Sequence, residues 1–166
     1  DNPFSVWAVV NQTATATVKT ILSRFDLDTG DTRREWWFAL DAAEKLYLRT
    51  YDDSAGDVYI GRTYSTALAT GSPLCISGTY DGSKQNSGFK LYSAGARIDN
   101  ANSTSGSYTA MEDKSSVTYL GATLSTAEAA ENLFNGSMGI VLATAQEILL
   151  TSQLALYNRA RDYFNF

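Results

Sequence analysis

The sequence predicts an all-β fold, an antiparallel sandwich of two sheets with a short C-terminal helix. Short apolar runs recur along the chain and are separated by turn-forming residues, which is the pattern of a sandwich. Aromatic residues, which are enriched in strands, make up 12% of the 166 residues. The chain is 44% hydrophobic and 19% charged, so it can bury a core as a single domain over residues 1–166.

About ten strands are expected from the spacing of these runs. Lys45–Tyr51 shows the clearest alternation, with Leu46 and Leu48 set against Tyr47 and Arg49, as a strand with one buried face requires. The expected strands are Phe4–Val10, Thr20–Asp26, Glu35–Asp41, Lys45–Tyr51, Val58–Ile60, Leu74–Tyr80, Phe89–Ser93, Ala96–Ile98, Val117–Gly121 and Met138–Ala143. The turns between them include Asp28–Asp31, Asp52–Gly56, Asp81–Ser83 and the hairpin turn Ala94-Gly95.

Three segments differ from this pattern. Asp99–Thr109 is rich in Asn, Ser and Thr and is expected to be an exposed loop. Ser125–Asn132 carries Ser125 and Glu128 at capping-box spacing, which predicts a short helix. Thr151–Phe164 is expected to form the C-terminal helix and to dock on the sandwich through one apolar face, made of Leu156, Tyr157, Ala160 and Phe164.

Charge and hydropathy exclude two classes of partner. The net charge of −5 repels polyanions, and the densest basic feature is the pair Arg33-Arg34, so no nucleic-acid binding is expected. No apolar stretch approaches the ~20 residues that span a bilayer, so no membrane insertion is expected.

Cysteine and histidine usage limits the chemistry further. The single cysteine, Cys75, lies in an apolar run and is interpreted as a small buried hydrophobic residue. Because the chain contains no histidine, it can form neither a serine–histidine catalytic pair nor a histidine-ligated metal site.

The middle of the chain carries a family motif. Ser77-Gly-Thr-Tyr-Asp-Gly-Ser83, Phe89-Lys-Leu-Tyr92 and Gly95 together resemble the "TYDGS…LxLYxNG" signature of laminin G-like and concanavalin A-like jelly rolls. Other segments match in the same order: Phe4–Val10, Ile21–Phe25, Glu35–Trp37, Tyr119–Ala122, Phe134–Ala143, Leu150-Thr151 and Leu156–Asn158. The resemblance covers nearly the whole chain and implies a jelly-roll sandwich. Since its glycines serve turns, it indicates architecture more than activity.

The chain also departs from that family. Ala94 stands where the second turn usually has Asn, and the family's first strand has no counterpart, so we expect a segment of a longer protein. Animal secreted laminin G modules commonly carry a disulfide, which one cysteine cannot form, and this favours a bacterial or viral source. The closing run Leu156–Phe164 resembles domains of structural proteins of tailed bacteriophages.

Several glycoside hydrolases share the jelly roll, but their carboxylate pattern is missing. A hydrolase of this kind needs two carboxylates on one strand face, separated by ~5 Å or by ~6.5–9.5 Å. Glu35 has no second carboxylate in phase before Asp41. Glu128 and Glu131 lie in a segment expected to be a loop or helix. We therefore predict a protein that is not an enzyme.

Ligand binding would use exposed aromatic side chains, and metal binding would use acidic loops. The expected ligand-binding residues are Trp36, Trp37, Tyr51, Tyr59, Tyr64 and Tyr108, where Trp36 and Trp37 must face opposite sides of their strand. No cofactor is expected to be required. The one ion considered is Ca²⁺, with Asp26, Asp28, Asp31, Asp52, Asp53 and Asp57 as its ligands, although Asp is also common in ordinary turns.

Two functions remain open from sequence. The first is a non-catalytic recognition or structural module of a virion (a bacteriophage capsid decoration, fibre or tail) or of a cell-surface protein involved in adhesion. Its partners would be a glycan, a host-surface receptor, neighbouring virion or surface subunits, or a second copy in a homo-oligomer. The second is a carbohydrate-binding accessory domain of a secreted bacterial polysaccharide-degrading enzyme. Either function places the protein on a virion surface or outside the cell.

Overall fold

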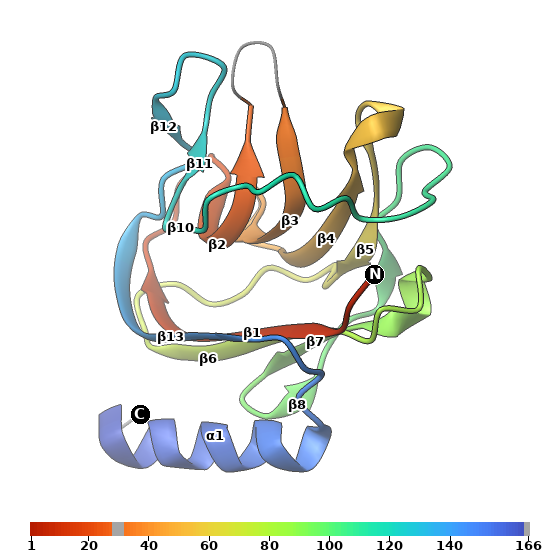
Figure 1. Ribbon diagram of the computed structural model, residues 1–166. Coiled ribbons are helices and arrows are strands. Elements are labelled where there is room, and N and C mark those ends of the chain that lie inside the picture. The colour runs from red at the N-terminus through yellow and green to blue at the C-terminus, as the bar shows by residue number, and fades with distance from the viewer. Residues whose placement is uncertain (28–31, 165–166) are drawn as a thin grey trace.

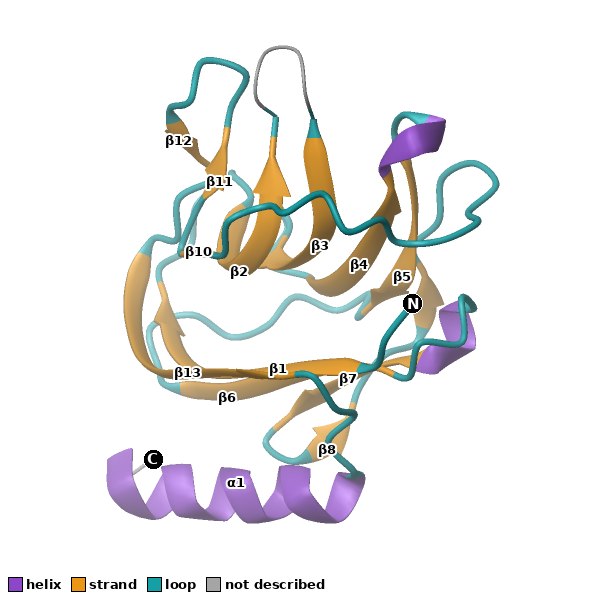
Figure 2. Ribbon diagram, in the orientation of Figure 1, coloured by secondary structure: helices purple, strands orange, loops and turns teal. Residues whose placement is uncertain are grey.

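Two β-sheets face each other across an apolar core, and a helix lies beneath the lower sheet (Figure 1). The structure is a computed structural model that describes residues 1–27 and 32–164. Figure 2 shows that strands and loops make up nearly all of it, with one long helix at the C-terminal end. This is the two-sheet jelly-roll sandwich with a C-terminal helix that the sequence predicts.

The lower sheet has five antiparallel strands in the order β13-β1-β6-β7-β8. Strands β1 and β6 pair along Phe4–Val10 and Leu74–Tyr80, in the centre of the sheet. The strands are β1 (Phe4–Gln12), β6 (Leu74–Tyr80), β7 (Phe89–Ser93), β8 (Ala96–Arg97) and β13 (Gly136–Thr144). We call it the five-stranded sheet.

The upper sheet has eight strands, and its path runs β12-β11-β2-β3-β4-β5-β9, with β10 pairing β2 beside β11. Neighbours are antiparallel except β11 and β2, which meet in parallel at Leu124 and Asp26. The strands are β2 (Lys19–Asp26), β3 (Arg33–Leu40), β4 (Leu46–Asp52), β5 (Val58–Thr63), β9 (Ala101–Asn102), β10 (Tyr119–Leu120), β11 (Thr123–Leu124) and β12 (Ala130–Glu131). We call it the eight-stranded sheet.

The core lies between the inner faces of the two sheets. Phe38 and Leu48 from the eight-stranded sheet pack in one buried cluster with Val6 and Ile76 from the five-stranded sheet. Each of these side chains is fully buried, and burial of a side chain of this size contributes roughly 1.5–3 kcal/mol. The alternation of Leu46 and Leu48 with polar or aromatic neighbours therefore sets which face of β4 points inward.

Helix α1 (Leu150–Phe164) covers the outer face of the five-stranded sheet (Figure 1). Ala160 packs with Trp7, Val9 and Cys75 in a second buried cluster. Leu156, Tyr157 and Phe164 pack against the same cluster, which confirms the predicted docking face. The buried Ser77 Oγ–H donates a hydrogen bond of 2.7 Å to Gln153 Oε1, and this bond fixes the helix on β6.

Two tight turns adopt the backbone that the motif implies. Gly82 has φ = +82° between β6 and β7, and Gly95 has φ = +75° between β7 and β8. Ala94 also adopts a positive φ, of +49°, which costs alanine more than it costs glycine or asparagine. Cys75 is buried, as predicted, and burial raises the pKa of its thiol to about 12.

Some sequence expectations are wrong in detail. Ser125–Asn132 forms a turn and then β12, because Ser125 Oγ accepts the N–H groups of Ala127 and Ala129 without a helix following. The Asp99–Thr109 segment is not a free loop, since β9 and a bridge from Ser105 to Tyr59 pair it with β5. The expected turn Asp28–Asp31 lies outside the described residues. No helix among the described residues has both the length and the apolar character needed to cross a membrane.

Candidate functional site

Five aromatic side chains cover the outer face of the eight-stranded sheet, and we call them the aromatic surface. Each ring contacts at least one other ring of the group: the Phe25 ring centroid is 4.8 Å from that of Trp37 and 5.1 Å from that of Tyr51. Trp37 contacts Tyr47 at 5.5 Å, and Tyr51 contacts Tyr59 at 5.5 Å. The rings therefore form one continuous layer across β2, β3, β4 and β5.

Strand alternation and register place these rings on one face. In β4, Leu46 and Leu48 point into the core, so Tyr47, Arg49 and Tyr51 point outward. The neighbouring strands align with them, because Trp37 lies opposite Arg49 and Tyr59 lies opposite Tyr51. The outer residues of adjacent strands are thereby close enough for their rings to meet.

Strand alternation along β2 also places Phe25 on the aromatic surface. The register between β2 and β3 shifts between Arg24 and Phe25. Arg24 lies opposite Trp36, which faces the core, whereas Phe25 contacts Trp37 on the outer face. The extra residue at this register shift is Glu35 of β3, since Arg24 lies opposite Trp36 and Phe25 lies opposite Arg34.

Arg49 lies within this layer of rings. Its guanidinium carbon is 4.2 Å from the centroid of Tyr47 and 4.6 Å from that of Tyr59, which is cation–π geometry. The Nε–H donates to Ser103 Oγ at 2.7 Å, across Gly61, which lies opposite Arg49 and has no side chain to block the path. No carboxylate among the described residues lies within ion-pair distance of Arg49, and its side chain is only half-buried.

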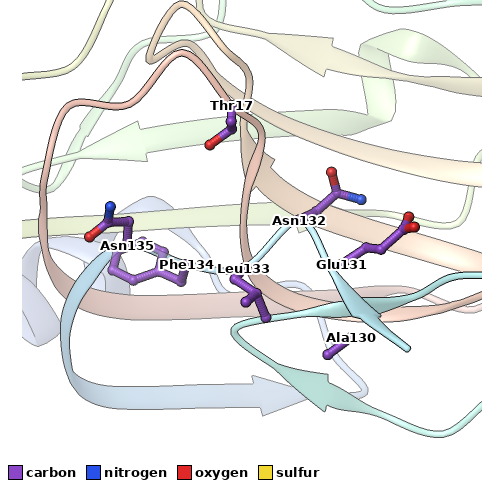
Figure 3. A pocket seen from close by; sticks show the side chains of 7 residues that line it. All are labelled: Thr17, Ala130, Glu131, Asn132, Leu133, Phe134 and Asn135. Atoms are coloured by element: carbon purple, nitrogen blue, oxygen red, sulfur yellow. The ribbon is translucent and has the colours of Figure 1, made fainter. Parts of the chain in front are cut away.

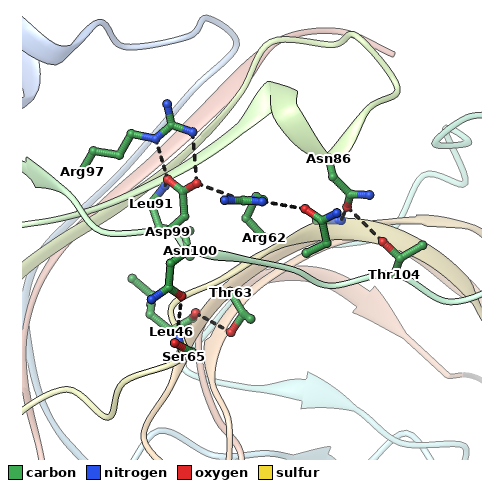
Figure 4. A network of polar contacts seen from close by, with 12 residues as sticks. Leu46, Arg62, Thr63, Ser65, Asn86, Leu91, Arg97, Asp99, Asn100 and Thr104 are labelled. Atoms are coloured by element: carbon green, nitrogen blue, oxygen red, sulfur yellow. Dashed lines mark hydrogen bonds and ion pairs between the residues drawn. The ribbon is translucent and has the colours of Figure 1, made fainter.

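Two other arginines of the eight-stranded sheet are neutralised. Arg34 pairs with Asp53 at 2.6 Å and also with Asp57. Arg62 pairs with Asp99 at 2.9 Å, within the polar network of Figure 4, where the Asp99 carboxylate lies between two arginines. Unlike these two guanidinium groups, Arg49 has no carboxylate partner among the described residues and is available to an anion.

The tyrosines of the aromatic surface remain uncharged. Burial raises the pKa of Tyr51 to about 12, and burial also raises the pKa of Tyr47 well above its ordinary value. Both hydroxyls therefore stay protonated at any physiological pH and can donate or accept hydrogen bonds. The site combines flat apolar rings, neutral hydroxyls and one uncompensated positive charge.

The structure brings together three of the six predicted ligand-binding residues: Trp37, Tyr51 and Tyr59. Trp36 faces the core and stacks near Phe4 at 5.3 Å. Two others pack against the core instead, and they are Tyr64 and Tyr108. The Tyr108 hydroxyl is also engaged, since it donates to Asp1 Oδ2 at 2.6 Å.

Sequence reasoning missed Arg49, Tyr47 and Phe25. The signal for two of them was present, because the alternation in Lys45–Tyr51 already placed Tyr47 and Arg49 on the outer face. Residue types alone did not show that Arg49 lacks a carboxylate partner. Alternation places Phe25 on the face opposite Arg24, but the residue types of β2 do not show which of its faces is the core.

The predicted calcium ligands are dispersed among other roles. Asp53 and Asp57 pair with Arg34. Asp52 Oδ2 instead accepts the backbone N–H of Thr109 at 2.8 Å, and Tyr119 donates to Asp26 at 3.5 Å. Asp28 and Asp31 lie outside the described residues. The part of the chain that the structure describes contains no cluster of three acidic, Cys or His side chains spaced to hold a metal.

Glu35 lies away from the aromatic surface and helps to fix the position of the loop residue Ser116. Its carboxylate pairs with Arg24 at 2.7 Å and accepts the Ser116 N–H at 3.0 Å. Arg24 Nε–H donates to the Ser116 carbonyl at 2.9 Å, so this ion pair binds both backbone groups of one loop residue. Burial raises the pKa of the Glu35 carboxyl. The ion pair therefore attaches the loop that contains Ser116 to strands β2 and β3.

An open groove lies near the start of β2 and is separate from the aromatic surface. It has a volume of about 630 Å³ and is lined by Thr17 and by residues 130–135 (Figure 3). Its side chains point in different directions around the space, and the exposed Leu133 lies among them. The groove contains no cation and no aromatic layer, so it lacks the combination found around Arg49.

Comparison with known proteins gives a fold likeness. No family model and no curated protein matches the sequence. Among solved structures, the CBM40 of a Ruminococcus gnavus IT-sialidase, bound to alpha2,3 sialyllactose, is similar with a TM-score of 0.73 and 15% identity. The match covers 94% of this chain and 83% of that chain.

Two other solved structures share the fold. The NanB sialidase from Streptococcus pneumoniae matches with a TM-score of 0.67 and 11% identity, over 93% of this chain and 24% of that chain. A heptameric SAP-like pentraxin from Limulus polyphemus matches with a TM-score of 0.59 and 10% identity, over 94% of this chain and 70% of that chain. At these identities the likeness establishes the jelly-roll sandwich and leaves the ligand to be argued from the side chains.

Proposed function

We propose that this protein is a non-catalytic glycan-recognition module whose aromatic surface binds a sugar that carries a carboxylate. The observation that carries the proposal is Arg49, a half-buried guanidinium held between Tyr47 and Tyr59 without a carboxylate partner among the described residues. A buried or half-buried charge is costly to leave uncompensated, so a ligand anion would complete the site.

Each part of the surface suits one part of an acidic sugar. The C–H face of a pyranose ring is apolar and packs on flat aromatic rings such as Trp37 and Tyr59. Sugar hydroxyls exchange hydrogen bonds with the half-buried Tyr59, whereas Tyr47 and Tyr51 are at most 3% exposed and support the site from beneath. The sugar carboxylate forms a charge-assisted pair with Arg49, which Tyr47 and Tyr59 already hold in place, so little side-chain entropy is lost on binding.

The solved structures support the same class of ligand. The similar CBM40 was solved with alpha2,3 sialyllactose and with alpha2,6 sialyllactose, and the sialic acid of both carries a carboxylate. A shared fold does not transfer a ligand by itself. It makes sialyllactose the first acidic glycan to test on this surface.

The test is a calorimetric titration of the chain with sialyllactose and, separately, with lactose, which lacks the carboxylate. We expect sialyllactose to bind and lactose to bind at least ~10-fold more weakly, since a hydrogen bond to a charged group contributes about 1.5–3 kcal/mol. Arg49→Gln keeps a polar side chain but removes the charge, and it should abolish this preference. Arg159→Gln removes an exposed arginine on α1 and serves as the matched control.

Equal binding of both sugars by the unchanged chain would contradict the charge argument. Retained preference in Arg49→Gln would place the carboxylate elsewhere. Arg159→Gln should leave the melting temperature close to that of the parent. Arg49→Gln also loses the Ser103 hydrogen bond and two cation–π contacts, so it should lower the free energy of unfolding by about 1–2 kcal/mol and still leave the chain folded.

The absence of catalysis is part of the proposal. The Glu35 carboxylate is occupied by Arg24 and Ser116, and it lies on the side of the sheet opposite the aromatic surface. We therefore expect no release of reducing sugar from a panel of polysaccharides or aryl glycosides. Turnover that Glu35→Gln abolishes would overturn this.

The setting of the module is a further part of the proposal. A virion or cell-surface protein and a secreted polysaccharide-degrading enzyme both use such a module outside the cell. The flanking sequence of the parent protein separates them, since fibre or capsid segments support the first and an adjacent catalytic domain supports the second.

A further inference from the structure

The four edges of the two sheets differ greatly in length. The edge strands β8, β9 and β12 are two residues long, whereas the edge strand β13 is nine residues long. Strand β13 pairs with β1 on one side only, so its other side presents backbone N–H and C=O groups without a neighbouring strand. Long unprotected edges are the ones that pair with other strands.

The side chains of β13 do nothing to block such pairing. Gly136–Thr144 contains no charged residue and no proline, the two common devices that protect an edge. None of its nine residues is fully buried, although six of the nine residues in the neighbouring β1 are buried in an unbroken run from Ser5 to Val10. Strand β13 therefore has the uncharged, proline-free composition of an interior strand although it lies at the edge of the sheet.

An apolar groove accompanies this edge. It runs between β13 and α1, is about 220 Å³ in one part, and is lined by Trp7, Ile140, Leu142 and Leu156, with Arg159 of α1 as its one charged lining residue. Ile140 is 41% exposed and Leu142 is 45% exposed on the strand side of the groove. On the helix, Leu149 is 65% exposed and Tyr163 is 79% exposed. Large apolar side chains gathered beside a free edge indicate an interaction surface.

We propose that two copies of this chain associate through β13, with antiparallel pairing across a two-fold axis near Ile140. A second copy is the occupant that matches the edge, because it supplies a strand of the same length with no charge to bury. Ile140 is the midpoint of Gly136–Thr144, so a two-fold axis there pairs the whole strand with itself. The five-stranded sheets of the two copies then become one continuous sheet.

The surface available is sufficient for such a dimer. At ~200 Å² for a fully exposed large side chain, Ile140, Leu142, Leu149 and Tyr163 expose about 500 Å². With the backbone edge added, this approaches the ~800 Å² per partner of a standard stable interface. The aromatic surface lies on the other sheet and stays free in both copies, so glycan binding by one copy does not depend on the dimer.

The test is the mass of the 166-residue chain in sedimentation equilibrium at about 10–100 μM, where a standard interface is populated. We expect twice the chain mass of 18.0 kDa. Ile140→Lys places like charges together at the axis and should weaken dimerisation by at least ~100-fold. Because Ile140 is partly exposed, the substitution should lower the melting temperature of the chain by no more than a few degrees. Val117→Lys, at an exposed apolar residue next to β10 of the eight-stranded sheet, should leave the dimer intact.

Charge complementation identifies the two-fold axis. Ile140→Lys and Ile140→Glu should each be monomeric alone, and an equimolar mixture should form a heterodimer, because residue 140 of one copy then lies opposite residue 140 of the other. A monomeric parent chain at 100 μM, a dimer unaffected by Ile140→Lys, or no recovery in the mixture would each overturn the proposal. Loss of glycan binding in Arg49→Gln has no bearing on these outcomes.

Discussion

On the outer face of the five-stranded sheet, Trp7, Val9 and Cys75 lie under α1. The outer face of the eight-stranded sheet, which carries Trp37 and Arg49, is covered by no described helix; Figure 2 shows the long helix under the other sheet. Both faces carry large apolar rings, yet the chain covers only one of them with its own helix. The difference separates two uses of aromatic residues, one for internal packing and one for contact with a ligand.

Charge follows the same division. Two arginines of the eight-stranded sheet form ion pairs with carboxylates, Arg62 with Asp99 and Arg34 with Asp53. Arg49 receives aromatic rings and a serine hydroxyl instead. The uncovered face therefore combines apolar rings with an unneutralised cation, an arrangement that internal packing does not explain. The predictions below test each side of this contrast.

Removing the cover should have the largest effect. Deleting Thr151–Phe166 exposes Trp7, Val9 and Cys75 to water and removes the packing of Leu156 and Phe164. Truncating one buried side chain of this size typically costs about 2–5 kcal/mol, and total stability is about 5–15 kcal/mol, so the shortened chain should unfold or aggregate. Denaturant titration followed by circular dichroism measures this.

The control for the deletion is Asp162→Ala, which changes an exposed residue of the same helix and should alter stability by at most about 0.5 kcal/mol. A shortened chain that melts at the parent temperature would mean that α1 is a free interaction arm. The contrast between a covered and an uncovered face would then be lost.

Removing the carboxylate partner of a paired arginine should cause the next largest loss of stability. Asp99 has a fully buried carboxylate that pairs with Arg97 at 2.8 Å and Arg62 at 2.9 Å and accepts the Leu91 N–H at 3.0 Å. Asp99→Ala leaves Arg62 without its partner, and breaking a buried pair in this way costs about 3–5 kcal/mol. Denaturant titration at pH 7 measures the loss.

The pH dependence gives the sign of the same interaction. Burial by itself would raise the pKa of Asp99, but hydrogen bonds from Arg97, Leu91 and Arg62 lower it below 3.8. The unfolded state then binds more protons, so Asp99 stabilises the fold above pH ~3.8, and this contribution disappears as pH falls through the lowered folded pKa. The stability gap between the parent chain and Asp99→Asn should therefore narrow below pH 4. A gap that is constant from pH 7 to pH 2 would contradict the ionised role of Asp99.

The smallest effect is expected at the turn beneath the helix. Ala94 has φ = +49° and is exposed in the β7–β8 turn, where asparagine adopts this conformation with less strain. Ala94→Asn should raise the free energy of unfolding by about 0.5–1 kcal/mol, measured by thermal melting. Ala94→Val, which tolerates a positive φ less well, should lower it. Equal melting temperatures for both variants would show that this turn carries no strain.

Much of the fold could be predicted because it depends on local patterns. Strands β6 and β7 end where the apolar runs end, at the Asp81-Gly82 turn and the Ala94-Gly95 turn. The C-terminal helix follows from the spacing of Leu156, Ala160 and Phe164. The two-residue strands β9, β11 and β12 could not be predicted, because they form where a loop happens to lie along an existing strand.

The candidate site was harder to predict because it depends on distant pairings. The sequence places Trp36 and Trp37 on opposite faces, but it does not say which face is the core. Arg62 pairs with a carboxylate 37 residues away, and nothing local distinguishes it from Arg49, which has no carboxylate partner in the part of the chain that the structure describes. Which arginine is left uncompensated is decided by the register of the sheet and the path of its loops.

The three tryptophans provide the most direct test of the central claim, since each lies in a different layer. Trp7 lies under α1, Trp36 lies in the core, and Trp37 lies on the aromatic surface, where its Nε1–H donates to Thr20 at 3.0 Å. Their indole N–H signals can be followed separately in a ¹⁵N–¹H correlation spectrum during titration with sialyllactose. The account predicts a saturable shift of the Trp37 signal while the Trp7 and Trp36 signals stay in place. An unmoved Trp37 signal, or a shift confined to Trp7 or Trp36, would contradict the assignment of the aromatic surface as the glycan site.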